Sequence, residues 1–382
     1  MKNLVKYPPN KKFKVRMRDL SVKDKRLISQ FNFSVKRVLD HGIFILGEEV
    51  IKFEKKLARY IGVNYCVGTC SASSALYLVF KSLNFSKGSK IITTPMSWLV
   101  SSTSFYMLGL EPTFVDIDKN YNLDPDEIEK KITKKTKAIL VVHFYGKVAQ
   151  MDRIKKIAKK NKILLIEDAA QAFGTNYKNK KTGSWGDFGI FSFSPMKTFP
   201  SFGDCGAIVF RNKKYLEKLK SLRTCGTINR EVCINPEIKH DMDAIQAGYL
   251  LDKFQFFDNL KKKRINLAKR YYRNLKEFEK EIFLPKIENE YNHSFYDFTI
   301  RVKNRQKVIN FMYSKQIEVK VRHPILISDQ PIFKNKNVKK ENLPFARKIV
   351  DEILCLPMHY NLTFKQVDYV CKNLIFILKR LN

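Results

Sequence analysis

The chain has few of the features that mark secreted, metal-binding or membrane-spanning proteins. Its seven cysteines are an odd number and include no CxxC pair, and Cys66 and Cys70 lack the spacing of a zinc site. No apolar stretch is long enough to span a membrane, and no apolar run of the kind found in secretory signals follows the basic N-terminal segment. We therefore expect a cytoplasmic protein with reduced thiols, no metal site and no membrane insertion.

Acidic residues are scarce, with 37 Asp and Glu against 72 Lys and Arg, which gives a formal net charge of +35. Such a charge is compatible with a surface that binds nucleic acid or an anionic membrane. The lysines are spread over most predicted helices opposite apolar stripes, as in IKFEKKLARYIG, and no nucleic-acid-binding motif accompanies them. The distribution favours a solvated, lysine-rich exterior and no nucleic-acid partner.

The length of 382 residues predicts two domains. Between residues 45 and 210, helical patterns alternate with short apolar runs, which predicts a doubly wound α/β layer. The expected strands are YCVGT, KIITTP, PTFVDID, KAILVVHFYG, KILLIED, FGIFSFS and GAIVF. After residue 242 a long helical stretch leads into FYDFTIRV, a helix, IEVKVRHP and two more helices. We predict a large α/β domain over 1–241, and a connecting helix with a small α+β domain over 242–382.

Asp168 and Lys197 are the residues with the clearest chemical implication. Asp168 closes the predicted strand KILLIED, at the edge where open α/β sheets gather ligand groups, and Lys197 follows 29 residues later at the exit of another strand. A lysine amine forms a Schiff base with pyridoxal phosphate, and a carboxylate keeps the pyridine nitrogen of that cofactor protonated. Alternatively, Asp168 caps the next helix and Lys197 is one more surface lysine.

Five further residues suit the same cofactor. Ser73 and Ser74 lie at the start of an apolar helix, where backbone N–H groups bind phosphate, and Ser192 can add a hydroxyl donor. Gln171 can hydrogen-bond the phenolic oxygen, and Trp98 can stack on the pyridine ring. Other interpretations stay open, namely a plain helix cap for the serines, a surface position for Gln171 and a core position for Trp98.

Motifs in series resemble those of the DegT/DnrJ/EryC1/StrS family of sugar aminotransferases. The resemblance runs from about residue 13 to the C-terminus. It is carried by FILGEEVIKFEKKLARYIGV, TTPMSWLVSSTSFYMLGLEPTFVDID, VVHFYGKVAQMD, EDAAQAFG, GSWGDFGIFSFSPMK, MDAIQAGYL, RHPILISDQPIF and LPFARKIVDEILCLPMH. It implies an α/β fold, the pyridoxal-phosphate transferase fold type I of aspartate aminotransferase, with a mostly parallel sheet and a smaller C-terminal α+β domain.

The resemblance also implies an activity. Lys197 would be the Schiff-base lysine and proton shuttle, with pyridoxamine phosphate as the intermediate form of the cofactor. The donor would be L-glutamate and the acceptor a nucleotide-linked keto-deoxysugar, in amino-sugar synthesis for surface polysaccharides such as lipopolysaccharide O-antigen. A homodimer with shared sites is expected, in which residues 225–242 reach across. A related branch has histidine in place of the lysine and dehydrates its substrate, so Lys197 favours transamination.

Three departures from the family pattern affect the site. Ala72-Ser73 replaces a Gly-Thr pair, which is tolerated only if the backbone at Ala72 needs no positive φ. Lys239-His240-Asp241-Met242 replaces a segment whose Asn contacts the phosphate of the neighbouring subunit. Because an Asp beside phosphate is unfavourable, we expect Lys239 or His240 to make this contact, unless the register differs.

The third departure is Arg322-His323-Pro324 in place of the family's HYP. Tyr296, Arg322 and His323 are candidate contacts to the substrate. Arg322 could bind a substrate phosphate or carboxylate, or be a plain surface arginine. The nucleotide, the sugar and the aminated carbon stay open. The alternatives are the same chemistry on a cyclitol or another ketone, and a non-catalytic binding or regulatory protein.

Overall fold

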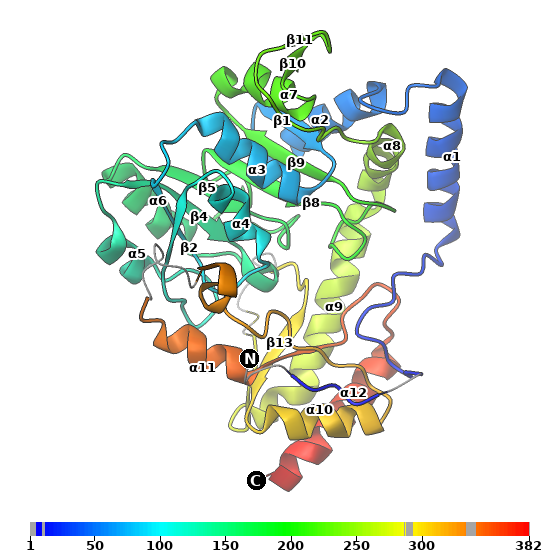
Figure 1. Ribbon diagram of the computed structural model, residues 1–382. Coiled ribbons are helices and arrows are strands. Elements are labelled where there is room, and N and C mark those ends of the chain that lie inside the picture. Colours follow the sequence, from blue (N-terminus) through cyan, green and yellow to red (C-terminus); the bar gives the residue numbers. More distant parts are fainter. Residues whose placement is uncertain (1–4, 10–11, 286, 288–292, 334–340, 382) are drawn as a thin grey trace.

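The computed structural model describes residues 5–9, 12–285, 287, 293–333 and 341–381. Its centre is a seven-stranded sheet in the order β1-β9-β8-β5-β4-β2-β3, drawn with its helices in Figure 1. The strands are β1 (Tyr65–Thr69), β2 (Lys90–Thr93), β3 (Glu111–Phe114), β4 (Thr136–Val142), β5 (Leu164–Asp168), β8 (Phe188–Ser192) and β9 (Gly206–Phe210). Only β9 runs against its neighbours, so the sheet is mostly parallel, as predicted.

The two faces of this sheet are covered by different helices. Ile166 and Leu140 pack in one apolar cluster with α3 (Ala72–Leu83), and Leu165 and Ile139 pack in another with α6 (Met151–Lys160). Adjacent side chains of one strand thus pack on opposite faces of the sheet. Because both faces are covered by helices, the strands are continuous apolar runs in the sequence. The prediction of a doubly wound α/β layer is confirmed.

The remaining helices surround this layer and continue into the C-terminal part. They are α1 (Lys25–His41), α2 (Glu48–Ile61), α4 (Val100–Tyr106), α5 (Pro125–Lys131), α7 (Leu216–Arg223), α8 (Ala244–Lys253), α9 (Phe257–Leu275), α10 (Arg305–Ser314), α11 (Pro344–Glu352) and α12 (Phe364–Leu381). The long helical stretch expected after residue 242 is divided into α8 and α9 by a 3-10 turn over Phe254–Phe256. No helix of the described ranges is both long and apolar enough to cross a membrane.

The C-terminal sheet differs in detail from the expected one. It is antiparallel, in the order β12-β13-β14, with β12 (Ile282–Phe283), β13 (Phe298–Val302) and β14 (Ile353–Leu356). The segment IEVKVRHP makes only isolated bridges, at Ile317 and Lys320, whereas ILCL of β14 is a strand in the region after it, for which only two helices were predicted. Two short hairpins complete the strands, β6 (Asn176–Tyr177) with β7 (Lys180–Lys181), and β10 (Thr227–Ile228) with β11 (Val232–Cys233).

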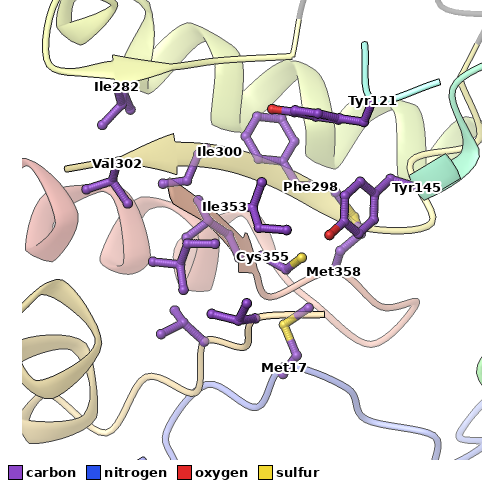
Figure 2. Packing of buried hydrophobic residues seen from close by; sticks show 14 of the residues in the cluster. Met17, Tyr121, Tyr145, Ile282, Phe298, Ile300, Val302, Ile353, Cys355 and Met358 are labelled. Atoms are coloured by element: carbon purple, nitrogen blue, oxygen red, sulfur yellow. The ribbon is translucent and has the colours of Figure 1, made fainter. Parts of the chain in front are cut away.

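One apolar core joins the C-terminal sheet to earlier parts of the chain. In Figure 2, Phe298 and Ile353 of the sheet lie in a cluster with Met17 of the N-terminal segment, with Tyr121 from the loop between β3 and α5, and with Tyr145 from the turn after β4. All five side chains are at most 5% exposed. Burial of this kind contributes about 25 cal/mol per Å² of apolar surface, so the core holds both parts of the chain together at the edge where β4 and β5 end.

A buried carboxylate stabilises that edge. Glu167 Oε1 accepts hydrogen bonds from the backbone N–H groups of Trp185 and Gly186 at 2.7 and 2.8 Å. Its Oε2 accepts from the N–H of Gly183 at 2.8 Å and lies 3.0 Å from His143 Nε2. Glu167 and His143 are both fully buried. The residue next to Asp168 therefore ties β5 to the loop that precedes β8.

Replacing Glu167 with glutamine should lower the free energy of unfolding by about 3 kcal/mol, because an amide nitrogen would face backbone donors in a buried site. Urea unfolding measures this change. The matched control is Glu127→Gln, which removes only an exposed pair with Lys130 and should cost less than about 0.5 kcal/mol. Equal effects of the two substitutions would contradict the assignment.

Candidate active site

The carboxyl ends of β1, β5 and β8 meet at one edge of the sheet, because these three strands run in the same direction. Asp168 is the last residue of β5 and is 6% exposed. Its Oδ2 accepts a hydrogen bond from Ser101 Oγ at 2.9 Å, and its Oδ1 accepts from the N–H of Ala170 at 3.1 Å. The bond to Ala170 is of the kind expected from a helix cap, but no helix follows, so the plain N-cap interpretation is wrong.

Gln171 follows Asp168 on the same loop and is 6% exposed, so the surface interpretation is wrong. Its Oε1 accepts a hydrogen bond from the backbone N–H of Tyr145 at 2.8 Å. Tyr145 has a φ of 54°, an unusual value for a tyrosine, which the tight turn after β4 imposes. The orientation of the Gln171 amide is thereby set by the backbone, and its NH₂ group remains as a donor.

Lys197 lies on a turn five residues beyond β8 and is half-buried. Its Nζ is 5.1 Å from the centre of the Tyr296 ring. In the described part of the chain no carboxylate forms an ion pair with it. The same turn is held at Thr198 by the hydroxyl of Tyr360 and at Pro200 by Lys253, whose Nζ donates to the Pro200 carbonyl at 2.7 Å.

A cavity of about 410 Å³ lies beside this turn. Residues 18–27, the turn over 195–202, the first half of α9 and residues 359–361 border it. Lys253 lines the cavity, and burial lowers the pKa of its amine to about 7. Arg18 and Lys197 are also among the lining residues, so the cavity continues from the Lys197 turn toward cationic side chains.

The helix α3 starts at the same edge, directly after β1. Ser71 is its N-cap, and its Oγ accepts from the N–H of Ser74 at 3.1 Å, while Ser73 is exposed in the first turn. Ala72 is helical and is not among the residues with positive φ, so the replacement of glycine there is tolerated. Ser192 ends β8 and is 6% exposed. The first turn of a helix leaves N–H groups without intrahelical partners, and these suit an anion.

Gly206 sets how closely β9 approaches that helix start. It pairs with Thr69 on one side and with Ser192 on the other. A Cβ added to Gly206 would lie 2.3 Å from the carbonyl carbon of Ser71 and 2.4 Å from the nitrogen of Ala72. Only glycine lets the backbones meet this closely.

Gly206→Ala is therefore expected to displace the start of α3 and to weaken binding of an anionic ligand there at least about tenfold. Fluorescence titration with pyridoxal phosphate measures the affinity. Gly62→Ala is the control for folding, because no heavy atom lies within 4 Å of an added Cβ there and its cost is the positive φ alone. An affinity as high in Gly206→Ala as in the unchanged chain would contradict the prediction.

Trp98 is 62% exposed, so the core interpretation is wrong. Its ring centre lies 5.9 Å from that of His323, with 61° between the ring planes. Burial, followed by the charge of Arg322, lowers the pKa of His323 to about 4, so this imidazole is neutral at pH 7. Trp98 and His323 thus lie together, from two distant parts of the chain.

Tyr296 and Arg322 meet near Lys197. The guanidinium carbons of Arg322 and Arg18 lie 5.6 and 4.8 Å from the centre of the Tyr296 ring. Arg322 Nε is 3.3 Å from Asp297 Oδ2, and Arg18 pairs with the other oxygen of Asp297. The side chain of Arg322 is 21% exposed, so the plain surface interpretation is wrong. Two guanidinium groups share one carboxylate here, which leaves an excess of positive charge.

The segment from Lys239 to Asp241 is divided between interior and surface. Lys239 is exposed, whereas His240 and Asp241 are at most 8% exposed. Asp241 Oδ1 accepts from Thr224 Oγ1 at 2.8 Å and lies 4.0 Å from Arg223 Nε. Its charge is therefore satisfied by residues of the same chain, whereas the side chain of Lys239 is exposed to solvent.

A sequence model of the DegT/DnrJ/EryC1/StrS aminotransferase family matches residues 26–375. The chain belongs to this family. It is 32% identical over 354 residues to the UDP-2-acetamido-2-deoxy-3-oxo-D-glucuronate aminotransferase of Pseudomonas aeruginosa, which covers 92% of this chain and 97% of the relative. It is also 32% identical to the dTDP-3-amino-3,6-dideoxy-alpha-D-galactopyranose transaminase of Aneurinibacillus thermoaerophilus, over 93% of this chain and 96% of the relative.

Solved structures of the family have the same fold. The structure of DesV from S. venezuelae in complex with a ketimine intermediate superposes with a TM-score of 0.91 at 28% identity, covering 96% of this chain and 99% of DesV. NtdA from Bacillus subtilis with bound cofactor PMP gives a TM-score of 0.87 at 29% identity, covering 94% of this chain and 83% of NtdA. The predictions of the family, the fold type, aminotransferase chemistry and the pyridoxal-phosphate cofactor are thereby confirmed.

The residues at this edge fit the family's cofactor. Asp168 is a buried carboxylate with which none of the described cationic side chains pairs, and a protonated pyridine nitrogen would supply the missing positive charge. The start of α3 offers N–H donors and the serine hydroxyls to a phosphate. Lys197 has an amine that no carboxylate of the described chain holds.

Three residues with a part in this arrangement were missed by the sequence reasoning. Ser101 lies within the quoted motif TTPMSWLVSSTSF, but nothing in a run of serines distinguishes the one that bonds Asp168. Glu167 precedes Asp168, and the sequence pattern indicates only that it belongs to the strand KILLIED. Arg18 reaches Tyr296 from 278 residues away in the chain, and no local pattern signals such a contact.

Proposed function

We propose that the protein is a pyridoxal-phosphate aminotransferase that transfers an amino group from L-glutamate to a nucleotide-linked keto-deoxysugar. The observation that carries the proposal is the buried carboxylate of Asp168, which forms no ion pair with a cation of the described residues and lies at the sheet edge where the Lys197 turn and the start of α3 also lie. The UDP- and dTDP-linked sugar substrates in the names of the two relatives support the choice of acceptor.

The bound cofactor supplies an electron sink for the carbon that gains or loses the amine. Lys197 would hold the cofactor through its amine between turnovers and, once released, would move a proton at the substrate carbon. Asp168 would keep the pyridine nitrogen protonated, and Ser101 orients the Asp168 carboxylate. Gln171 would donate to the ring oxygen, Trp98 would contact the ring, and Ser73, Ser74 and Ser192 would bind the phosphate.

Tyr296, Arg322 and His323 are proposed to contact the substrate. Arg322 and Arg18 share the single charge of Asp297, so an anionic group of the donor or of the sugar nucleotide would complete the balance of charge. Because the pKa of His323 is lowered to about 4, His323 would act there as a neutral hydrogen-bonding group. The high net positive charge of the chain would favour the approach of a diphosphate.

We further propose a cytoplasmic homodimer that shares its sites, with residues 225–242 as the arm that reaches the partner. Ile228, Val232, Ile234 and Ile238 of this arm are 49 to 70% exposed, which is unusual for isoleucine and valine and supports burial against a second copy. Lys239, exposed at the end of the arm, is the proposed contact to the partner's cofactor phosphate. The product would serve surface-polysaccharide synthesis, with lipopolysaccharide O-antigen as the proposed case.

Ile238→Glu should convert the dimer into monomers, because a charge would replace a side chain buried between the copies. Light scattering after size-exclusion chromatography gives the mass. Phe364→Glu is the matched control, since Phe364 is 52% exposed on α12, away from the arm, and should leave the mass unchanged. A chain that is monomeric without any substitution would contradict the proposed dimer.

The proposed activity is tested by supplying pyridoxal phosphate, L-glutamate and a set of ketones. We expect formation of 2-oxoglutarate and an amine product by mass spectrometry with a UDP- or dTDP-linked keto-sugar. Amination of a cyclitol ketone alone would replace the proposed acceptor. The chain is also 32% identical to a Pleiotropic regulatory protein of Geobacillus stearothermophilus, so failure to bind cofactor would favour the regulatory alternative.

A further inference from the structure

Cys70 lies between β1 and α3, one residue before the N-cap Ser71, and is half-buried. Its Sγ is 3.1 Å from Ser74 Oγ, and Ser74 Oγ is in turn 3.1 Å from Ser71 Oγ. The thiol therefore points toward hydroxyl donors at the positive end of a helix dipole. This environment favours a thiolate over a thiol.

His240 completes this side of the cluster. The backbone N–H of Cys70 donates to the carbonyl of His240 at 2.9 Å, so the two residues lie side by side, and the thiol and the imidazole are near enough to shift each other's pKa. His240 Nε2 is 3.5 Å from Glu237 Oε1, and the Glu237 side chain is 4% exposed. Tyr77 packs against the imidazole, with 5.8 Å between the ring centres. Cys70, His240 and Glu237 thus form a chain of thiol, imidazole and carboxylate.

The electrostatics agree with that geometry. Burial acts to raise the pKa of the Cys70 thiol, but the hydrogen bonds from His240 and Ser74 outweigh burial and lower that pKa. Burial acts to lower the pKa of His240, but its bonds to Cys70 and Glu237 raise it. Lys81 also faces the cluster, with its Nζ 3.7 Å from Glu237 Oε2. Both shifts favour an ion pair of thiolate and imidazolium.

The other six cysteines differ from Cys70. Cys66, Cys205, Cys355 and Cys371 are buried, and burial raises the pKa of each of these thiols. Cys225 and Cys233 are exposed, but they lie on the arm proposed to contact a second copy, so the reference for Cys70 is the same thiol in a variant without the His240 ring. No group of His, Cys, Asp and Glu side chains in the described ranges could hold a metal ion, so the Cys70 cluster is not a metal site.

We propose that Cys70, His240 and Glu237 form a reactive-thiolate site at which a peroxide oxidises Cys70 to a sulfenic acid. Partial burial between β1 and α3 restricts the site to small electrophiles, and the neighbouring hydroxyls and imidazolium donate to an oxygen as it leaves. The transamination assigned above uses neither the thiol of Cys70 nor the ring of His240.

The oxidation balances within the cluster. The Cys70 thiolate attacks one oxygen of hydrogen peroxide, a sulfur–oxygen bond forms and the oxygen–oxygen bond breaks. The departing hydroxide takes the proton of the His240 imidazolium and leaves as water. Sulfur has lost two electrons, peroxide has gained them, and a thiol reductant restores Cys70. Glu237 keeps the imidazole oriented and charged before the step.

The site is coupled to the cofactor, and this part rests on the proposed function. Ser74 Oγ bonds the sulfur of Cys70 and is also a proposed donor to the cofactor phosphate. An oxygen atom added to the Cys70 sulfur would need space and a hydrogen-bond donor beside Ser74 Oγ, where the cofactor phosphate is proposed to bind. Oxidation of Cys70 is therefore expected to weaken cofactor binding, and bound cofactor to slow the oxidation.

The first test uses the full chain without added cofactor, treated with hydrogen peroxide and dimedone, with each cysteine followed by peptide mass spectrometry. Cys70 of the unchanged chain should be labelled at least about fivefold faster than Cys70 of His240→Asn, as for a thiolate compared with a thiol. Glu237→Gln should slow the labelling less than His240→Asn does. Thermal unfolding of both variants checks that the fold is kept. Labelling of Cys70 that neither substitution slows would overturn the proposal.

The second test compares pyridoxal-phosphate affinity before and after peroxide, and after repair with dithiothreitol. The unchanged chain should lose affinity severalfold and regain it, whereas Cys70→Ser should show no response to peroxide. An oxidised chain that binds cofactor as tightly as the reduced one would overturn the coupling. A chain that binds no cofactor in either state would instead contradict the proposed function, and the dimedone labelling would still decide on the Cys70 site.

Discussion

Lys197→Ala should leave a folded protein whose transamination rate is lower by about 10⁴-fold or more. The substitution removes both the covalent link to the cofactor and the base that moves the proton, and proton transfer by a positioned side chain alone contributes up to about 10⁴-fold. Stability should hardly change, because Lys197 is half-buried and forms no ion pair within the described residues. Steady-state assays and thermal unfolding measure the two effects.

The matched control is Lys213→Ala, an exposed lysine outside this edge of the sheet, which should leave the rate unchanged. Addition of a primary amine such as methylamine should partly restore proton transfer in Lys197→Ala. A rate within tenfold of the unchanged enzyme would contradict the role of Lys197 in the chemistry.

Asp168→Asn should lower the rate by about 10³-fold, the second largest effect that we expect. Asparagine has the size of aspartate and can still contact Ser101 and the N–H of Ala170, but it carries no charge. The pyridine nitrogen would then lose its proton, and the cofactor would become a poor electron sink. The absorption spectrum of the bound cofactor and the rate should change together.

Asp124→Asn is the control for that substitution, because Asp124 only caps α5 by accepting from the N–H of Asp126. It should leave the rate unchanged and cost little stability, since asparagine is also a good N-cap residue. Ser101→Ala should have a smaller effect than Asp168→Asn, as it loosens the carboxylate without removing it. A full rate in Asp168→Asn would show that another group protonates the cofactor.

Much of the α/β layer could be predicted because its signals are local. The seven apolar runs from YCVGT to GAIVF became the seven strands of the central sheet, namely β1 to β5, β8 and β9, and the Asp-Pro pair at 124–125 begins α5. The C-terminal part was harder. ILCL of β14 follows directly on α11, and only pairing with β13 makes it a strand. The division at residues 241 and 242 stays a prediction, since one core contains both Tyr121 and Phe298.

The candidate site was predictable where a residue ends a strand or begins a helix. Asp168, Ser192 and Ser74 are of this kind, and their positions follow from the sheet direction. Contacts between residues far apart in the chain could not be predicted, because no local sequence pattern encodes them. The bond from Ser101 to Asp168 spans 67 residues, and the one from the Tyr145 N–H to Gln171 depends on a tyrosine with positive φ.

Asp241 shows how the structure changes an inference from the sequence. Asp241 lies in the segment that replaces the family's phosphate-contacting segment, so the sequence suggested that its charge would repel the cofactor phosphate. Thr224 and Arg223 of the same chain instead contact its buried carboxylate, and Lys239 is left at the surface. The roles of Lys239 and of the substrate contacts Tyr296, Arg322 and His323 stay predictions.

The most direct test of the account is the absorption spectrum of the purified protein with pyridoxal phosphate, before and after L-glutamate is added. We predict a visible band from cofactor joined to Lys197, absent in Lys197→Ala, that bleaches when glutamate converts the cofactor to its amine form. A band that forms but does not respond to glutamate would contradict the proposed donor. No band at all would contradict the central claim that Lys197, Asp168 and the start of α3 hold this cofactor.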